Sequence, residues 1–134
     1  MASDNYDEKI ERICIREFGY SPKYAFDIAD DFDRIRETVE HYIEISGSLS
    51  ESCRKRISKI SFKANRVNIM ITRLILVTDQ LAAAAKESYA LKKPVKKHPV
   101  KVEDAHELIK EIEKQFESLL RDLDEYVCDV EKSY

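Results

Sequence analysis

The sequence predicts an all-α protein, an antiparallel bundle of three to four long helices with coiled-coil-like packing. Only two Gly and three Pro occur in 134 residues, while 37% of the residues are charged. This balance is typical of long helices rather than of strands joined by turns. Apolar residues also recur at alternating steps of three and four along most of the chain. The length suits one core, so we expect residues 1–134 to form a single domain.

Four helices are expected, with bounds at about 4–18, 22–45, 49–92 and 102–131. Gly19 supplies a left-handed stop after the first helix, and Ser21 followed by Pro22 is a start signal for the second. The second helix ends at Ser46, Gly47 and Ser48. Ser48 with Glu51 three residues later fits a capping box for the third helix. Such a short loop between long helices predicts an antiparallel hairpin.

The third expected helix is the longest and serves as a spine. Its apolar seam keeps the three-four rhythm through Cys53, Ile57, Ile60, Ala64, Val67, Ile71, Leu74, Thr78, Leu81 and Ala85. No other helix is as long, so we expect the second helix along its first half and the first helix along its second half. The stretch from Ile69 to Val77 is apolar nearly all round, which predicts burial on several sides.

Residues 92–101 cannot form a regular helix, because they contain two prolines among five lysines. We expect a semi-rigid crossing that leads into the fourth helix. That helix has a wide apolar stripe, which suits packing against two other helices.

Charge is strongly polarised along the chain. Residues 1–51 hold six basic and thirteen acidic side chains, residues 52–101 hold thirteen and two, and residues 102–134 hold four and eleven. A hairpin about Gly47 would place acidic residues of the second helix opposite basic residues of the third: Glu40 with Arg56, Glu37 with Lys59, Asp33 with Lys63, and Asp30 with Arg66. We therefore expect the basic middle to be neutralised mostly by the second helix, at about 0.2–1 kcal/mol per exposed pair.

The expected charge pairing between the second and third helices leaves several basic residues without a partner, and these are the candidate interaction residues. They are Arg54, Lys55, Arg73, Lys92, Lys93, Lys96, Lys97 and Lys101. An alternative function is therefore that of a nucleic-acid-binding accessory protein that uses the Lys-rich segment 86–101. The acidic pI of about 5.7 and the scarcity of nearby aromatic residues, with only Phe62 and Tyr89 as candidates, disfavour it.

Motifs for catalysis or cofactor binding are missing from the sequence. No phosphate-binding Gly loop and no nucleophile motif occurs. Glu103 and His106 have the Glu-x-x-His spacing of di-iron bundles, but the second copy that such a centre needs is absent. We expect no enzyme, no cofactor, no metal site and no small-molecule substrate.

Arg36 and His41 have the R-x4-H spacing that resembles the motif of HEPN-type ribonucleases, which are helical bundles. This resemblance implies a second alternative, a HEPN-like ribonuclease in which the two residues converge on RNA across a dimer. His41 is flanked by Glu37, Glu40 and Glu44, a setting typical of a surface side chain.

The three cysteines Cys14, Cys53 and Cys128 are an odd number without a CxxC pair, so we expect buried free thiols and a reducing environment. The N-terminal residues lack a signal-peptide pattern, and no apolar run approaches the roughly 18 residues of a membrane span. These features predict a chain that is cytoplasmic or otherwise intracellular. The sequence as a whole predicts a non-enzymatic interaction or structural module, such as an adaptor, a scaffold or an accessory subunit, with a protein partner or self-association.

Overall fold

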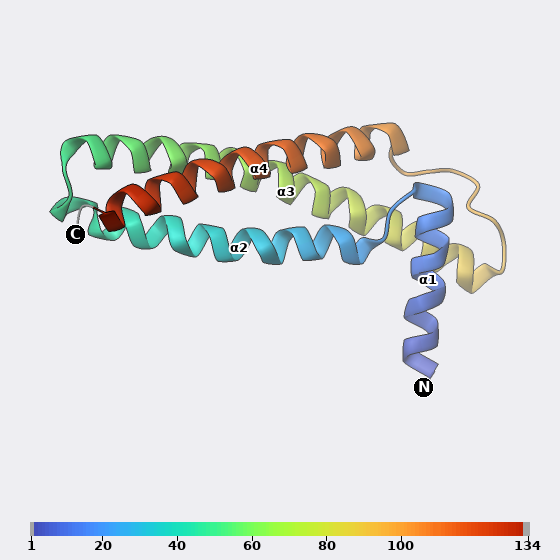
Figure 1. The fold of residues 1–134 in the computed structure, drawn as a ribbon. Helices are drawn as coiled ribbons and strands as arrows, with labels where there is room; N and C mark the ends of the chain where they lie inside the picture. The colour runs from blue at the N-terminus through green and yellow to red at the C-terminus, as the bar shows by residue number, and fades with distance from the viewer. Residues whose placement is uncertain (1, 133–134) are drawn as a thin grey trace.

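The computed structural model describes residues 2–132, and the side chains from Tyr6 onward. It contains α1 (Ala2–Phe18), α2 (Pro22–Glu44), the short 3-10 helix η1 (Ile45–Ser48), α3 (Glu51–Leu91) and α4 (Val102–Lys132). Helices α2, α3 and α4 lie side by side, and α1 crosses the far end of α3 (Figure 1). The predicted all-α bundle is confirmed, and each predicted helix end lies within two residues of the observed one.

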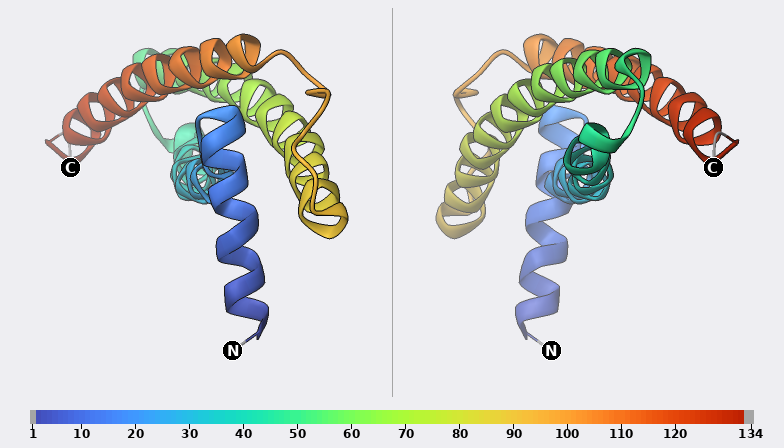
Figure 2. Two further views of the ribbon diagram at one scale, coloured as in Figure 1. Left: turned by 90° about the vertical axis from the view of Figure 1, so that its right-hand side faces the viewer. Right: turned by 90° about the vertical axis from the view of Figure 1, so that its left-hand side faces the viewer.

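The two views along α2 in Figure 2 show how the helices diverge. Helices α3 and α4 cross above α2 and splay apart toward their ends, while α1 projects away from the start of α2. As a result α3 has α2 and α4 on one side of its first half and α1 against its second half.

Local sequence explains where α2 and α3 begin. Ser21 caps α2, and its hydroxyl accepts a hydrogen bond from the backbone N–H of Lys23 over 3.2 Å. The cap of α3 is Ser50, whose hydroxyl accepts from the N–H of Cys53 over 3.2 Å. The prediction that Ser48 forms this cap is wrong, because Ser48 belongs to η1 and its hydroxyl donates to the carbonyl of Ile45.

The predicted seam of α3 forms the core. All its members from Ile57 to Ala85 are buried. One apolar cluster joins α2, α3 and α4, and a second joins α1 to the C-terminal half of α3 through Ile10, Cys14, Phe18, Leu81 and Ala85. The predicted arrangement of α2 and α1 along the two halves of α3 is therefore confirmed. Burying each such Leu, Ile or Phe side chain contributes about 1.5–3 kcal/mol.

The corner between α1 and α2 is fixed by contacts to both other long helices. Gly19 adopts a left-handed φ of 81°, and a Cβ at this position would lie 2.6 Å from the His106 ring. Nε2 of His106 on α4 lies 2.7 Å from the carbonyl oxygen of Phe18. The Tyr20 hydroxyl lies 2.9 Å from Oγ1 of the buried Thr78 on α3. Glycine is needed at this corner both for its conformation and for the space.

The lysine crossing has the non-helical form that its prolines predict. Lys92 ends α3 in a left-handed conformation with φ of 52°, and the Ser88 hydroxyl donates to the carbonyl of Lys93. Val95 and Val100 rest against the α1–α3 cluster. The chain then enters α4 at Val102.

The cysteines differ from the expectation of three buried thiols. Cys14 is buried, Cys53 is partly buried and Cys128 is exposed. The expectation is wrong for Cys128, because α4 turns this residue away from the stripe that contains Tyr126 and Val130.

By length and composition, α3 is the one helix among the described residues that could cross a membrane. Its most apolar 18-residue window has a mean hydropathy of 1.3, and 28% of that window is buried. Arg73 interrupts the apolar run in this helix. A count of uninterrupted apolar residues in the sequence therefore does not find this 18-residue window. A core helix that is mostly buried in its own protein satisfies the same criteria of length and composition.

Candidate interaction faces

The basic segment of α3 is tied to α4 rather than to α2. Nζ of Lys63 lies 2.7 Å from Oδ2 of Asp122 and also donates to the hydroxyl of Ser118. Nη1 of Arg56 lies 2.9 Å from Oδ2 of Asp129. Two cations at one edge of α3 are therefore neutralised by α4.

The predicted charge pairing between α2 and α3 is wrong. Across the described helices, none of the four expected pairs lies within ion-pair distance. Arg36 on α2 itself pairs with Asp33 at 3.4 Å and with Glu40 at 3.9 Å. The helical spacings of three and four residues make these local contacts available without any partner helix. In addition, η1 delays the start of α3 to Glu51, so the register assumed from Gly47 does not apply.

An exposed apolar line runs along the outer side of α3. Phe62, Ile69 and Leu76 are 67%, 61% and 60% exposed, and they follow one another at intervals of seven residues. We call these three residues the outer stripe. The prediction that Ile69–Val77 is buried on several sides is wrong here, because α1, α2 and α4 gather against the seam on the other side of α3.

A basic groove of about 500 Å³ borders the outer stripe, between α3 and α4. Its apolar lining includes Phe62, Ile69 and Met70. Four cations and two carboxylates complete its charged lining: Lys59, Lys63, Arg66, Arg73, Glu111 and Asp122. Cations therefore predominate beside the exposed apolar residues, and we call this hollow the α3–α4 groove.

A second groove, of about 310 Å³, lies on the other side of α4, against α2. Its apolar lining is Tyr24, Ile28, Ile112, Phe116 and Leu120. Its charged lining is entirely acidic and consists of Asp31, Glu113 and Glu117. We call it the α2–α4 groove, and its charge is opposite to that of the α3–α4 groove.

Tyr24 closes one side of the α2–α4 groove. Its hydroxyl donates to Oε1 of Glu113 over 2.7 Å. This hydrogen bond, helped by partial burial and the negative charge of Glu113, raises the pKa of Tyr24 to about 12. The phenol therefore stays protonated at neutral pH and leaves the carboxylates as the only charges of the groove lining.

The candidate lysines of the crossing lie at three places rather than at one. Lys92 and Lys93 line an open hollow of about 980 Å³ together with Lys9, Arg12 and Arg16 of α1. Lys96 and Lys97 line a separate hollow with Lys93 beside the end of α3. Lys101 lies beside Glu17 and His98.

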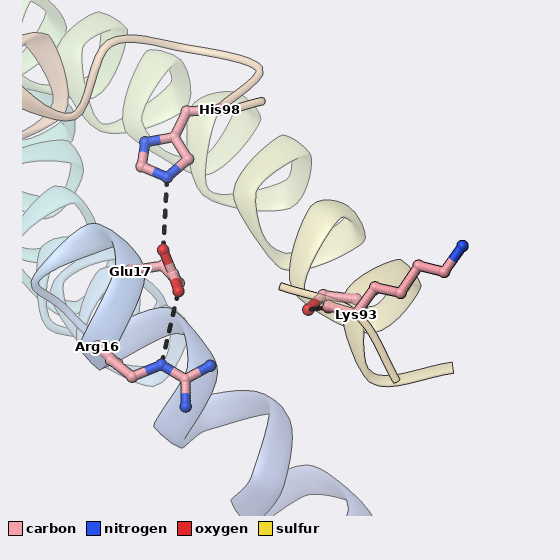
Figure 3. A network of polar contacts seen from close by, with 5 residues as sticks. Arg16, Glu17, Lys93 and His98 are labelled. Carbon is pink, nitrogen blue, oxygen red and sulfur yellow. Dashed lines mark hydrogen bonds and ion pairs between the residues drawn. The ribbon is translucent and has the colours of Figure 1, made fainter. Parts of the chain in front are cut away.

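Glu17 offsets part of this positive charge, as Figure 3 shows. Its carboxylate lies 3.5 Å from Nε of Arg16 and 3.6 Å from Nε2 of His98. The side chain of Lys93 points away from this group, and the residue is exposed. The sequence prediction missed the three basic residues of α1 that line the hollow with Lys92 and Lys93. The predicted packing of the first helix beside the end of the third was the signal that could have found them.

The remaining candidates lie far from the crossing. Arg54 and Lys55 are at the opposite end of α3, where Arg54 donates to the carbonyl of Leu49 and Lys55 pairs with Glu51 at 3.6 Å. Arg73 lines the α3–α4 groove. The predicted set therefore does not form a single site.

The motif residues that the sequence analysis considered for chemistry are not brought together in the described part of the chain. Arg36 is engaged by Asp33 and Glu40, and His41 is exposed and meets the Tyr42 ring edge-on. His106 is used at the Gly19 corner. Among residues 2–132, no group of three or more His, Cys, Asp or Glu side chains is arranged to hold a metal ion.

Comparisons with protein-family models, with curated protein sequences and with solved structures find no match to this chain. The fold and the faces described above define its class, a small all-helical bundle with exposed apolar and charged grooves.

Proposed function

We propose that this chain is a non-enzymatic helical interaction module, an adaptor, scaffold or accessory subunit that binds another protein chain through the outer stripe of α3. The observation that carries this proposal is the exposure of Phe62, Ile69 and Leu76 at intervals of seven residues. Single exposed apolar residues are common on protein surfaces, whereas an aligned series marks a surface that a partner covers.

The spacing also indicates the form of the contact. Residues seven apart lie on one side of a helix, close to two full turns from each other, so the stripe offers three aligned apolar side chains to a partner helix or groove. Cations on the α3–α4 groove side of this stripe add a charge pattern that orients a partner. Apolar burial would supply most of the affinity, and the charges would supply specificity and a faster association rate.

A photo-reactive amino acid at position 69 tests this proposal in the native host cells. We expect light-dependent protein adducts from position 69, and none from the matched exposed position 114 on the outer side of α4. The adducts from position 69 should disappear when Phe62 and Leu76 are both replaced by Ser. Equal labelling from positions 69 and 114, or no adduct from position 69, would contradict the proposal.

A second candidate function is favoured by the hollow beside α1. Five cations from two segments distant in sequence line it against one carboxylate, Glu17, and Nζ of Lys9 lies 5.6 Å from the centre of the Tyr89 ring. A basic hollow with an aromatic wall suits a single-stranded nucleic acid. Fluorescence anisotropy with labelled single-stranded RNA and DNA tests this function. Salt-dependent binding that is lost in Lys92→Gln/Lys93→Gln but kept in Arg54→Gln/Lys55→Gln would support it, and no binding at low salt would end it.

A further inference from the structure

We propose that the partner of the outer stripe is a second copy of this chain, which docks its α2–α4 groove on the α3–α4 groove and outer stripe of the first. This inference rests on the proposed function, since it assigns an occupant to the same face. Each copy would then offer one basic and one acidic face, and the contact between two copies would be head-to-tail.

Charge complementarity is the first argument. The α3–α4 groove carries four cations against two carboxylates, and one of these cations, Lys63, is already paired with Asp122. The α2–α4 groove carries three carboxylates and no cation in its lining. Asp31 and Glu117 of one copy can therefore approach Arg66 and Arg73 of the other, which favours this pairing over a contact between like faces.

Apolar complementarity is the second argument. The outer stripe presents side chains that are 60–67% exposed at the edge of the α3–α4 groove, whereas the α2–α4 groove is a hollow whose exposed surface is mainly apolar. Tyr24 and Leu120 are 41% and 36% exposed at this hollow. The outer stripe can bury the side chain of Ile69 against Leu120 and Phe116 of the neighbour, in the helix-in-groove manner.

A symmetric contact between two outer stripes is disfavoured by charge. The segment from residue 52 to residue 78 contains seven Lys or Arg residues and no Asp or Glu. Two such segments placed side by side would bring like charges together, which costs free energy at an interface. The head-to-tail arrangement avoids this repulsion.

The two faces lie on opposite sides of α4, and their linings share no residue. One copy can therefore use both faces at once. Heterologous contacts of this kind close into a ring or continue as a filament, depending on the rotation between successive copies. We infer that the chain assembles beyond a dimer as its concentration rises.

Two single substitutions test this arrangement, because each disables a different face. Ile69→Asp places a charge on the exposed stripe, and Leu120→Asp places one in the α2–α4 groove. Each variant alone should remain monomeric in sedimentation velocity at concentrations where the unmodified chain assembles, with association weakened by about 30-fold or more. Mixed together, the two variants should form a 1:1 dimer and nothing larger, because each still holds one intact face.

Ile15→Asp on α1 is the matched control, since Ile15 is an exposed isoleucine, at 49%, outside both grooves. It should assemble like the unmodified chain. Circular dichroism must show the same helix content for all variants. If Ile69→Asp or Leu120→Asp loses helix content, two charge-reversal variants replace them: Arg66→Glu/Arg73→Glu and Asp31→Lys/Glu117→Lys. Their mixture should assemble, because the reversed face of one variant is again opposite in charge to the reversed face of the other.

Several outcomes would overturn the proposal. An unmodified chain that stays monomeric at high concentration would do so, as would assembly that both groove variants retain or a mixture that stays monomeric. Binding of the monomer to anionic phosphatidylserine vesicles, lost in Ile69→Asp, would assign the stripe to a lipid surface instead. Adducts from position 69 that contain only other proteins would reject the second copy and keep the interaction function, whereas the absence of any adduct would reject both.

Discussion

Lys63 of α3 and Asp122 of α4 form an ion pair over 2.7 Å, and Ser118 accepts a second hydrogen bond from the same ammonium group. This contact shows how the positive middle of the chain is held within the fold. Lys63, Arg66 and Arg73 all line the α3–α4 groove, and of these three Lys63 is paired with α4. The two arginines therefore supply the positive charge beside the outer stripe in the proposed binding face.

A double-mutant cycle with Lys63→Met and Asp122→Asn measures the strength of this contact. The side chains are 30% and 42% exposed, so we expect a coupling of about 0.5–1 kcal/mol in the free energy of unfolding, smaller at high salt. Urea denaturation provides the measurement. The matched control is the cycle with Glu37→Gln and Lys59→Met, which should show no coupling. A coupling for Glu37 with Lys59 as large as that for Lys63 with Asp122 would contradict the observed register.

Gly19→Ala should destabilise the fold strongly. The substitution forces a left-handed φ on a non-glycine residue and places a Cβ 2.6 Å from the His106 ring. We expect a loss of about 1–3 kcal/mol in the free energy of unfolding. Gly47→Ala is the control, because a Cβ there has no neighbour within 4 Å, and it should be neutral or slightly stabilising. Equal effects at the two glycines would show that the corner against His106 is not as described.

Stability should fall at alkaline pH through the thiol of Cys14. Burial, reinforced by Glu11 and opposed by Lys86, raises the pKa of Cys14 from 9.0 to about 11. The unfolded chain therefore loses this proton first, so the stabilisation is complete below pH 9 and decreases as the pH rises toward 11. Chemical denaturation between pH 8 and pH 11 measures the slope. Cys14→Ala should flatten it relative to that variant's own stability at pH 8, whereas Cys128→Ala, at the exposed thiol, should leave it unchanged.

The purified chain should not cleave RNA. Arg36 is occupied by two carboxylates of its own helix, and His41 is an exposed side chain. Incubation with labelled single-stranded RNA, followed by gel analysis, should give intact RNA for the unmodified chain and for His41→Ala alike. Cleavage that disappears in His41→Ala would restore the HEPN-like alternative.

The core could be predicted from the sequence because helical spacing reports directly on which residues share one side. Every predicted seam residue of α3 from Ile57 to Ala85 is buried, and the corner at Gly19 follows from a local stop signal. These features depend only on residues that are close together in the chain, so the sequence alone is enough to predict them.

The charged contacts could not be predicted in the same way, because they depend on the register and rotation between helices. The 3-10 turn η1 changes where α3 begins, and α4 rather than α2 meets Lys63 and Arg56. The exposure of Ile69 could not be predicted either. A helix segment that is apolar on all sides indicates that burial is favourable, but it does not show whether the other helices of the same chain bury it. The seven-residue interval from Phe62 to Leu76 was nevertheless visible as a second stripe beside the seam.

The most direct test of the account is the solvent accessibility of the outer stripe in the cell. Rapid hydroxyl-radical oxidation, read by mass spectrometry, compares Phe62 and Leu76 in native host cells with the same residues in the dilute purified chain. We predict strong protection of both residues in the cell, and equal oxidation of the control residue Ile15 in the two samples. Equal oxidation of Phe62 and Leu76 in the cell and in the dilute chain would contradict the claim that the outer stripe of α3 is a binding face.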